Sequence, residues 1–312
     1  MGTLDFDLKG VVALAEEAGR ATLTCYQKPL EIRYKGDESP VSQADELSHQ
    51  IIAKGLADTG LQVVSEEGQT QSKATRYWCV DPLDGTKSFI AGVEDFTVNI
   101  ALIVEGRPVW GVVVAPVLEV AWFGGLEGGS WRKAQGQPQR IQCTPPQEPL
   151  RVLASRNHLN DATQNFIETL GAVERVQRGS SLKFCAIAEG QADLYPRLGP
   201  CCEWDTAAGE AVLIGAGGSI CDFQGRPLAY GKADVLNPNF LASGQTDPRH
   251  YLPKGQHNQQ GAKTDTGLKG NHRGHSGRIS TQFSRQNVAG WRCGGGHHQE
   301  NQYTKLGGES GR

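Results

Sequence analysis

The segment 78–89 limits the possible folds of this chain more than any other stretch. It reads Trp-Cys-Val-Asp-Pro-Leu-Asp-Gly-Thr-Lys-Ser-Phe, so a short apolar strand runs directly into Asp81 and Asp84. Their carboxylates are hard oxygen ligands of the kind Mg²⁺ prefers, and the proline between them has a fixed φ that helps to turn the Leu83 carbonyl toward the same ion. The segment therefore predicts a magnesium site at the end of a buried strand.

The same turn predicts an anion site beside the metal. Gly85 has no side chain to block a phosphate, and Thr86 can donate to it if a helix begins here. Because Asp, Gly and Thr also gather in ordinary surface turns, the pattern needs support from elsewhere in the chain. A second apolar strand ends in Glu66 and Glu67, and Asp205 stands at the start of an Ala-rich helix. Strand ends and helix starts are places where open α/β sheets gather their ligands.

These three segments, in this order, resemble the inositol monophosphatase superfamily of lithium-sensitive, magnesium-dependent phosphatases. They read Ser-Glu-Glu at 65–67, Asp-Pro-Leu-Asp-Gly-Thr at 81–86 and Trp-Asp-Thr-Ala-Ala-Gly at 204–209. The resemblance covers roughly residues 5 to 245. It implies a mixed α+β and α/β fold, a layered αβαβα sandwich with an active-site cleft between two subdomains.

One branch of this superfamily is the most similar. Gly-Ser-Ser-Leu-Lys-Phe-Cys at 179–185, Ala-Glu-Gly-Gln-Ala-Asp-Leu-Tyr-Pro-Arg at 188–197 and Leu-Asn-Pro-Asn-Phe at 236–240 resemble the bacterial 3′(2′),5′-bisphosphate nucleotidases. The resemblance implies removal of the 3′-phosphate of adenosine 3′,5′-bisphosphate, giving AMP and phosphate. Hydrolysis of the 3′-phosphosulfate relative, which would give adenylyl sulfate, is left open. The resemblance also implies a role in sulfur assimilation and nucleotide recycling.

The resemblance also implies how two Mg²⁺ ions would be held. Glu66, Asp81 and the Leu83 carbonyl would bind the first ion, and Asp81, Asp84 and Asp205 the second, with a third ion at Glu66 left open. A phosphate dianion in front of these acids is repelled by about 4 kcal/mol per charge pair at 4 Å and an effective dielectric of 20. Divalent ions reverse this field, activate the attacking water and stabilise the leaving oxygen.

Three further residues are candidates for handling the attacking water. By resemblance, Thr86 lies within reach of Glu67 or Asp45 and would orient or deprotonate this water. Each also has an ordinary structural role: Thr86 as a helix N-cap, Asp45 as the capping acid of a helix that Ser42 opens, and Glu67 as a solvated strand-end acid. The catalytic and structural roles of Thr86 are compatible.

Substrate contacts depend on fewer residues. Ser180 and Lys183 could hold the second phosphate, and Arg197 could form a bidentate contact or stack on adenine. The alternative for each is a solvated surface side chain, and for His158 a structural role. The full set of expected substrate contacts is Glu66, Asp84, Gly85, Thr86, His158, Ser180, Lys183, Arg197 and Asp205.

Hydrophobic periodicity divides the chain into two halves. Residues 1–145 contain two amphipathic helices, two strands with the acidic ends, and an antiparallel meander over 96–104, 109–114 and 119–123. In residues 146–253, strands at 150–154, 172–176, 192–195 and 219–223 alternate with helices at 161–170, 181–189 and 205–215, as βα units do. With Asp205 in the second half and the other ligands in the first, the site is expected between the halves.

Composition changes sharply near residue 254. Residues 254–312 contain nine Lys or Arg against three acids, with little apolar periodicity, so this basic tail is predicted to be disordered. The first 20 residues contain no uninterrupted apolar run, so neither a secretory signal nor a transmembrane helix is predicted. We expect a cytoplasmic monomer or homodimer with a small nucleotide substrate and no nucleic-acid partner, and peripheral association with the inner membrane is left open.

Two other functions are open at this stage. An inositol or sugar monophosphatase would use the same metal motifs. Lys183 and Arg197 distinguish the two functions, because the second phosphate of a bisphosphate substrate needs cations and an inositol ring does not. A non-enzymatic interaction module, with the basic tail contacting RNA or acidic partners, would have no reason to keep a full set of metal ligands.

Overall fold

The computed structural model describes residues 7–29, 32–34, 40–154 and 160–253. His158 and the tail 254–312 lie outside these ranges. The elements up to residue 141 are α1 (Leu8–Leu23), β1 (Ile32–Tyr34), β2 (Pro40–Ser42), α2 (Gln43–Leu56), η1 (Ala57–Thr59), β3 (Gln62–Ser65), β4 (Arg76–Asp84), α3 (Thr86–Ile90), β5 (Thr97–Val104), β6 (Arg107–Ala115), β7 (Val120–Gly125), β8 (Gly129–Lys133) and β9 (Gln139–Ile141). Those that follow are β10 (Leu150–Ala154), α4 (Asp161–Thr169), β11 (Val173–Gln177), α5 (Leu182–Ala188), β12 (Leu194–Arg197), α6 (Glu203–Gly215), β13 (Ser219–Asp222), β14 (Phe240–Ser243) and η2 (Pro248–Tyr251).

The larger sheet has seven strands in the order β3-β4-β5-β6-β7-β8-β9. β3 and β4 are parallel, and the other neighbouring strands are antiparallel. Short turns connect β5 to β6, β6 to β7 and β7 to β8, whereas α3 lies between β4 and β5. The predicted meander is therefore present as β5, β6 and β7, and β8 and β9 continue it beyond the sequence prediction. The parallel β3–β4 pair brings the two acidic strand ends to the same edge.

Side chains along β4 alternate between the two faces of this sheet. Trp78 and Val80 belong to one hydrophobic cluster with α1 and α2, whereas Tyr77 and Cys79 belong to another with α5 and α6. Because successive residues of a strand point to opposite faces, Asp81 continues the row of Tyr77 and Cys79. β4 thus delivers Asp81 to the face that α6 covers.

The smaller sheet has five strands in the order β11-β10-β12-β14-β13. β10 is parallel to β11 and β12, as the predicted βα pattern requires. β14 was not predicted from the sequence, and it pairs antiparallel with both β12 and β13. The sheet is therefore mixed.

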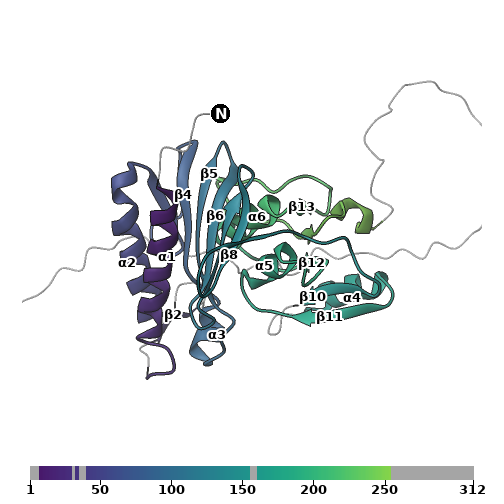
Figure 1. Ribbon diagram of the computed structural model, residues 1–312, viewed down its shortest axis with the longest axis horizontal. Coiled ribbons are helices and arrows are strands. Elements are labelled where there is room, and N and C mark those ends of the chain that lie inside the picture. The colour runs from purple at the N-terminus through teal and green to yellow at the C-terminus, as the bar shows by residue number, and fades with distance from the viewer. Residues whose placement is uncertain (1–6, 30–31, 35–39, 155–159, 254–312) are drawn as a thin grey trace, which may run out of the picture.

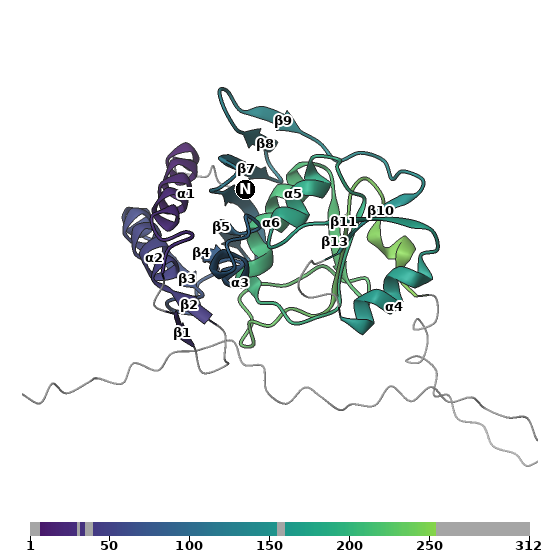
Figure 2. The ribbon, with the colours of Figure 1, turned by 90° about the horizontal axis from the view of Figure 1, so that it is seen from below.

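The elements stack in five layers, which confirms the expected αβαβα sandwich (Figure 1). α1 and α2 cover the outer face of the larger sheet, α5 and α6 lie between the two sheets, and α4 lies beyond the smaller sheet (Figure 2). One hydrophobic cluster contains Cys79, Phe184 and Phe240, so the middle layer packs against both sheets. The division into two subdomains at residue 145 stays a prediction. No helix in the described ranges is both long and apolar enough to cross a membrane.

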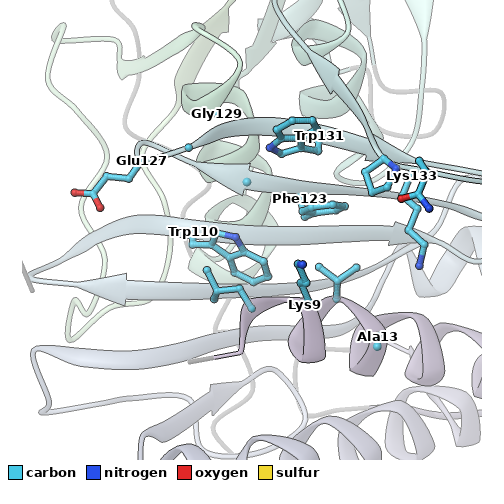
Figure 3. Close-up of a pocket in the computed structure, with 14 residues that line it drawn as sticks. Lys9, Ala13, Trp110, Phe123, Glu127, Gly129, Trp131 and Lys133 are labelled. Carbon is cyan, nitrogen blue, oxygen red and sulfur yellow. The ribbon is translucent and has the colours of Figure 1, made fainter. Parts of the chain in front are cut away.

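A groove of about 590 Å³ lies on the outer face of the larger sheet, beside the N-terminal turns of α1. Three aromatic side chains, Trp110, Phe123 and Trp131, line it together with Lys9 and Lys133 (Figure 3). Since this is the face that α1 covers, the groove is on the side of the sheet opposite to Asp81.

Candidate active site

The end of β4 is irregular, and this places its acidic residues. Asp81 pairs with Asn99 and Asp84 with Thr97, with a shift of register between the two pairs. The Leu83 amide donates to Asp81 Oδ1 at 3.1 Å. The bulge lets one short segment present both aspartates near the edge where β3 ends.

Three carboxylates from different elements converge at this edge. Glu66 directly follows β3, its amide donating to the Val80 carbonyl at 3.3 Å, and Asp205 is the third residue of α6. One carboxylate oxygen from each of Glu66, Asp81 and Asp205 lies within 4.8 Å of the others. Three hard oxygen donors at this spacing fit a divalent cation such as Mg²⁺.

Gly111 permits the close approach of α6 to the larger sheet. A Cβ atom at this position would lie 2.8 Å from the backbone of Ala208 in α6. Any larger residue would therefore push α6, and Asp205 with it, away from β4.

Asp84 is not part of this group of three, and other residues hold its carboxylate. Its Oδ2 accepts from the Ser181 amide at 2.7 Å, from Ser181 Oγ at 3.0 Å and from Asn99 Nδ2 at 3.4 Å. Ser181 Oγ also lies 3.0 Å from the Asp205 carbonyl. Ser181 and Asn99 were missed in the sequence analysis, although Ser181 is part of the segment 179–185 that carried the resemblance.

Thr86 begins α3, directly after the turn at Gly85. Gly85 has a φ of 97°, and a Cβ there would lie 3.0 Å from the Asp95 carbonyl oxygen, so the turn requires glycine. The Thr86 hydroxyl lies 3.0 Å from Asp45 Oδ1 and 3.3 Å from the Leu83 carbonyl oxygen. Thr86 is thus a neighbour of both the predicted ligand carbonyl and a buried acid.

Asp45 performs the capping role that the sequence indicated. Its Oδ2 accepts from the Ser42 amide at 2.8 Å and from Ser42 Oγ at 2.6 Å at the start of α2. The same side chain, only 2% exposed, therefore fixes the helix and contacts Thr86. Of the two acids predicted to lie near Thr86, Asp45 makes this contact, and a catalytic role for Glu67 stays a prediction.

The predicted phosphate-binding cations lie inside the fold. Lys183 is 4% exposed and donates from Nζ to the Ser180 carbonyl at 2.7 Å, so it is no solvated surface lysine. Its Nζ is also 5.2 Å from the centre of the Tyr195 ring. Half-buried Arg197 donates to the carbonyls of Gly199 and Pro200.

Comparison with known proteins identifies the family. The profile of the inositol monophosphatase family matches residues 4–258. The chain belongs to this family. Its sequence is 45% identical to 3′(2′),5′-bisphosphate nucleotidase CysQ of Salmonella typhimurium over 242 residues, which cover 75% of this chain and 98% of that protein. It is 44% identical to the CysQ protein of Escherichia coli K12, over 76% of this chain and 99% of that protein.

Solved structures agree with the family assignment. The crystal structure of CysQ from Bacteroides thetaiotaomicron matches with a TM-score of 0.69 and 35% identity, covering 78% of this chain and all 100% of that chain. The IMPase of Thermotoga maritima, at 23% identity, matches with a TM-score of 0.68 over 78% of this chain and 94% of that one. The second match supports the fold alone.

Burial and mutual repulsion raise the pKa values of Asp81 and Asp205. Burial, together with the charges of Asp84 and Glu66, raises the pKa of Asp205 to about 8. Burial also raises the pKa of Asp81 well above its usual range, with the charges of Glu66, Asp84 and Asp205 adding to the shift. Burial lowers the pKa of Lys183 to about 8, against the opposing effect of Asp84. Ionising the acids is therefore unfavourable unless a cation joins them.

These pKa shifts predict that the stability of the metal-free protein and the stabilisation by Mg²⁺ change in opposite directions with pH. Between the ordinary pKa of 3.8 and about 8, the folded state keeps a proton on Asp205 that the unfolded chain has lost. Metal-free stability should therefore fall as pH rises through this window, whereas the stabilisation by added Mg²⁺ should grow, because metal binds the ionised acids. Calorimetric Tm values with chelator and with Mg²⁺ measure both trends. A Mg²⁺ effect on Tm that does not change with pH would contradict the assignment, and Asp205→Asn should flatten both trends.

Proposed function

We propose that this chain is a Mg²⁺-dependent phosphomonoesterase that removes the 3′-phosphate of adenosine 3′,5′-bisphosphate. The convergence of Glu66, Asp81 and Asp205 within 4.8 Å supports this reaction most directly. The bisphosphate substrate follows from the 44–45% identity to relatives named 3′(2′),5′-bisphosphate nucleotidase. Hydrolysis of the 3′-phosphosulfate relative, a cytoplasmic location and a monomeric or homodimeric state stay predictions.

The acidic residues would hold the metal. Glu66, Asp81 and Asp205 supply the carboxylates, and we place Asp84 and the Leu83 carbonyl beside them as further donors. Bound Mg²⁺ supplies neutralising charge for the phosphate, an activated water and stabilisation of the leaving oxygen. Two ions are proposed, and a third at Glu66 stays open.

Thr86 and Asp45 would handle the proton of the attacking water. With its hydrogen directed to Asp45 Oδ1 at 3.0 Å, the Thr86 oxygen is left as an acceptor for a water proton. Ser42 holds the other Asp45 oxygen with two hydrogen bonds, so the acid cannot easily turn away. This relay orients the water without requiring Thr86 to ionise.

Lys183, Ser180 and Arg197 would bind the rest of the substrate. A buried ammonium close to Asp84 can exchange its contact with the Ser180 carbonyl for a stronger contact with a phosphate oxygen. Arg197 presents a planar cation suited to a second phosphate or to the face of adenine. His158 is proposed to face the nucleotide on sequence grounds alone.

A side-by-side assay tests this function. The purified protein with Mg²⁺ is offered adenosine 3′,5′-bisphosphate, inositol 1-phosphate and fructose 1,6-bisphosphate, and released phosphate is measured. We expect kcat/KM to favour the adenosine bisphosphate by about 10-fold or more, because a single charged contact contributes about 1.5 kcal/mol or more. Preference for inositol 1-phosphate would indicate the monophosphatase alternative, and no release from any substrate would indicate a non-enzymatic protein.

A further inference from the structure

The orientation of Asp205 depends on the first turn of α6. The Cys202 amide donates to Asp205 Oδ2 at 2.8 Å and so fixes the carboxylate relative to the start of the helix. A displacement of this turn would move Asp205 relative to Glu66 and Asp81, which belong to other elements.

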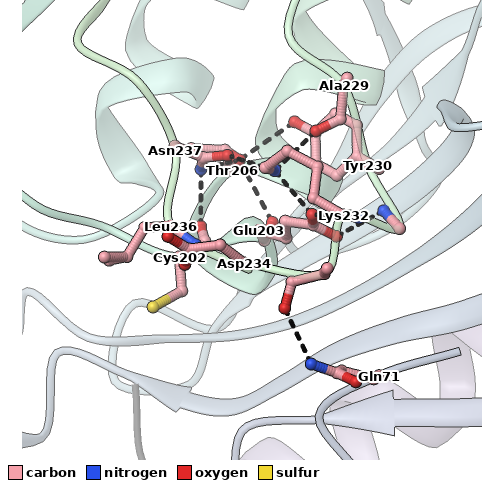
Figure 4. Close-up of polar contacts among 12 residues, drawn as sticks. Gln71, Cys202, Glu203, Thr206, Ala229, Tyr230, Lys232, Asp234, Leu236 and Asn237 are labelled. Atoms are coloured by element: carbon pink, nitrogen blue, oxygen red, sulfur yellow. Dashed lines mark hydrogen bonds and ion pairs between the residues drawn. The ribbon is translucent and has the colours of Figure 1, made fainter. Parts of the chain in front are cut away.

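A segment without regular secondary structure holds this turn, and we name it the clamp segment, residues 229–237 (Figure 4). The Asn237 amide donates to the Cys201 carbonyl at 2.8 Å, and the Glu203 amide donates to the Val235 carbonyl at 3.0 Å. Asn237 Nδ2 donates to the Cys202 carbonyl at 2.7 Å and to Thr206 Oγ1 at 2.9 Å. The clamp segment thus forms hydrogen bonds with Cys201, Cys202, Glu203 and Thr206 at the start of α6.

An ion pair between the partly exposed Lys232 and the buried Glu203 joins the clamp segment to α6. Glu203 is 2% exposed, and its Oε1 accepts from Lys232 Nζ at 2.6 Å and from the Lys232 amide at 3.0 Å. The other oxygen accepts from the Gly231 amide at 2.7 Å. The two backbone amides carry no net charge, so the Lys232 ammonium is the cation that neutralises this buried carboxylate and holds Glu203 against the clamp segment.

The clamp segment also reaches the loop that carries Glu66. Gln71 Nε2, from the connection between β3 and β4, donates to the Ala233 carbonyl at 2.8 Å. The clamp segment therefore bridges two elements that carry converging carboxylates, as Figure 4 shows for Gln71 and Glu203.

We propose that Lys232 is a positioning residue that sets the distance of Asp205 from Glu66 and Asp81, and thereby the affinity of the site for divalent metal. It acts through Glu203 and the first turn of α6 and touches neither metal nor substrate. The inference rests on the proposed function, because it assumes that these three carboxylates bind metal.

Lys232→Met tests this role, with Mn²⁺ binding followed by titration calorimetry and Mg²⁺ dependence followed by phosphate release. Groups that orient metal ligands typically contribute 10-fold to 100-fold in affinity, so the variant should bind Mn²⁺ about 10-fold more weakly. The matched control is Lys133→Met, which breaks a Lys–Glu pair of 2.7 Å between β8 and Glu16 of α1. The control should lose some thermal stability and bind Mn²⁺ as the wild type does.

A second variant leaves the Lys232–Glu203 ion pair in place. Gln71 is exposed, so Gln71→Ala should fold and still remove its contact with Ala233. We expect Mn²⁺ binding to weaken by about 3-fold, as the loss of one neutral hydrogen bond suggests. Wild-type affinity in both variants, or an equal loss in Lys133→Met, would overturn the positioning role while leaving the proposed function intact. A wild-type protein that binds no Mn²⁺ would remove the proposed function and this inference together.

Discussion

Replacing Asp81 by Asn is expected to lower kcat/KM for adenosine 3′,5′-bisphosphate by about 10³-fold. Asp81 is 1% exposed, and its carboxylate is one of the three that converge, together with those of Glu66 and Asp205. An amide supplies no negative charge, so the variant loses a metal contact that contributes several kcal/mol to catalysis. Initial rates of phosphate release at saturating Mg²⁺ provide the measurement.

The same variant should not be destabilised in the absence of metal. The pKa of Asp81 is raised by burial and by its acidic neighbours, so removing the carboxyl relieves repulsion and the metal-free Tm should stay the same or rise. Asp161→Asn, at an exposed position in the first turn of α4, is the matched control and should keep full activity. Full activity in Asp81→Asn would remove the metal mechanism, and low activity together with a large fall in Tm would show a role in folding instead.

Replacing Lys183 by Met is expected to lower kcat/KM for adenosine 3′,5′-bisphosphate by about 100-fold. The side chain is buried beside the proposed phosphate-binding position, and a desolvated contact between an ammonium and a phosphate contributes about 2–5 kcal/mol. Methionine keeps most of the apolar volume, so the packing around Tyr195 should survive. The measurement compares this substrate with adenosine 3′-monophosphate, which lacks the second phosphate.

The comparison separates two roles for Lys183. If Lys183 binds the second phosphate, its replacement should lower kcat/KM for adenosine 3′-monophosphate by about 10-fold or less. This substrate would be affected only by the changed electrostatic potential of the site. Equal losses for both substrates would instead indicate that Lys183 balances the charge of Asp84. Burial raises the pKa of Asp84, and the charge of Lys183 opposes this shift. Arg175→Met, at an exposed position on β11, is a suitable control and should affect neither substrate.

Local signals made much of the fold predictable. The capping box of Ser42 and Asp45 is present as the sequence indicated, and the acidic strand end followed by a Gly-Thr helix start is present as β4, Gly85 and α3. Each of these features involves residues within a few positions of one another, so propensity, capping and turn chemistry agree on a single structure.

Contacts between distant segments were not predictable in the same way. Ser181 holds Asp84 across 97 positions of sequence, and Lys232 pairs with Glu203 across 29. No local pattern marks such partners, because either side chain alone reads as an ordinary polar residue. β14 was missed for a related reason: it is a short apolar strand that periodicity does not mark, and its pairing with β12 and β13 joins segments distant in sequence.

In the proposed mechanism, Glu66, Asp81 and Asp205 together hold a catalytic divalent metal. Anomalous diffraction from crystals soaked in Mn²⁺ tests it most directly, since Mn²⁺ replaces Mg²⁺ at sites of carboxylate oxygens and can be located by its own signal. Anomalous density in contact with all three carboxylates is the expected result. Crystals without density there, from protein that hydrolyses the bisphosphate in the same Mn²⁺ solution, would contradict it.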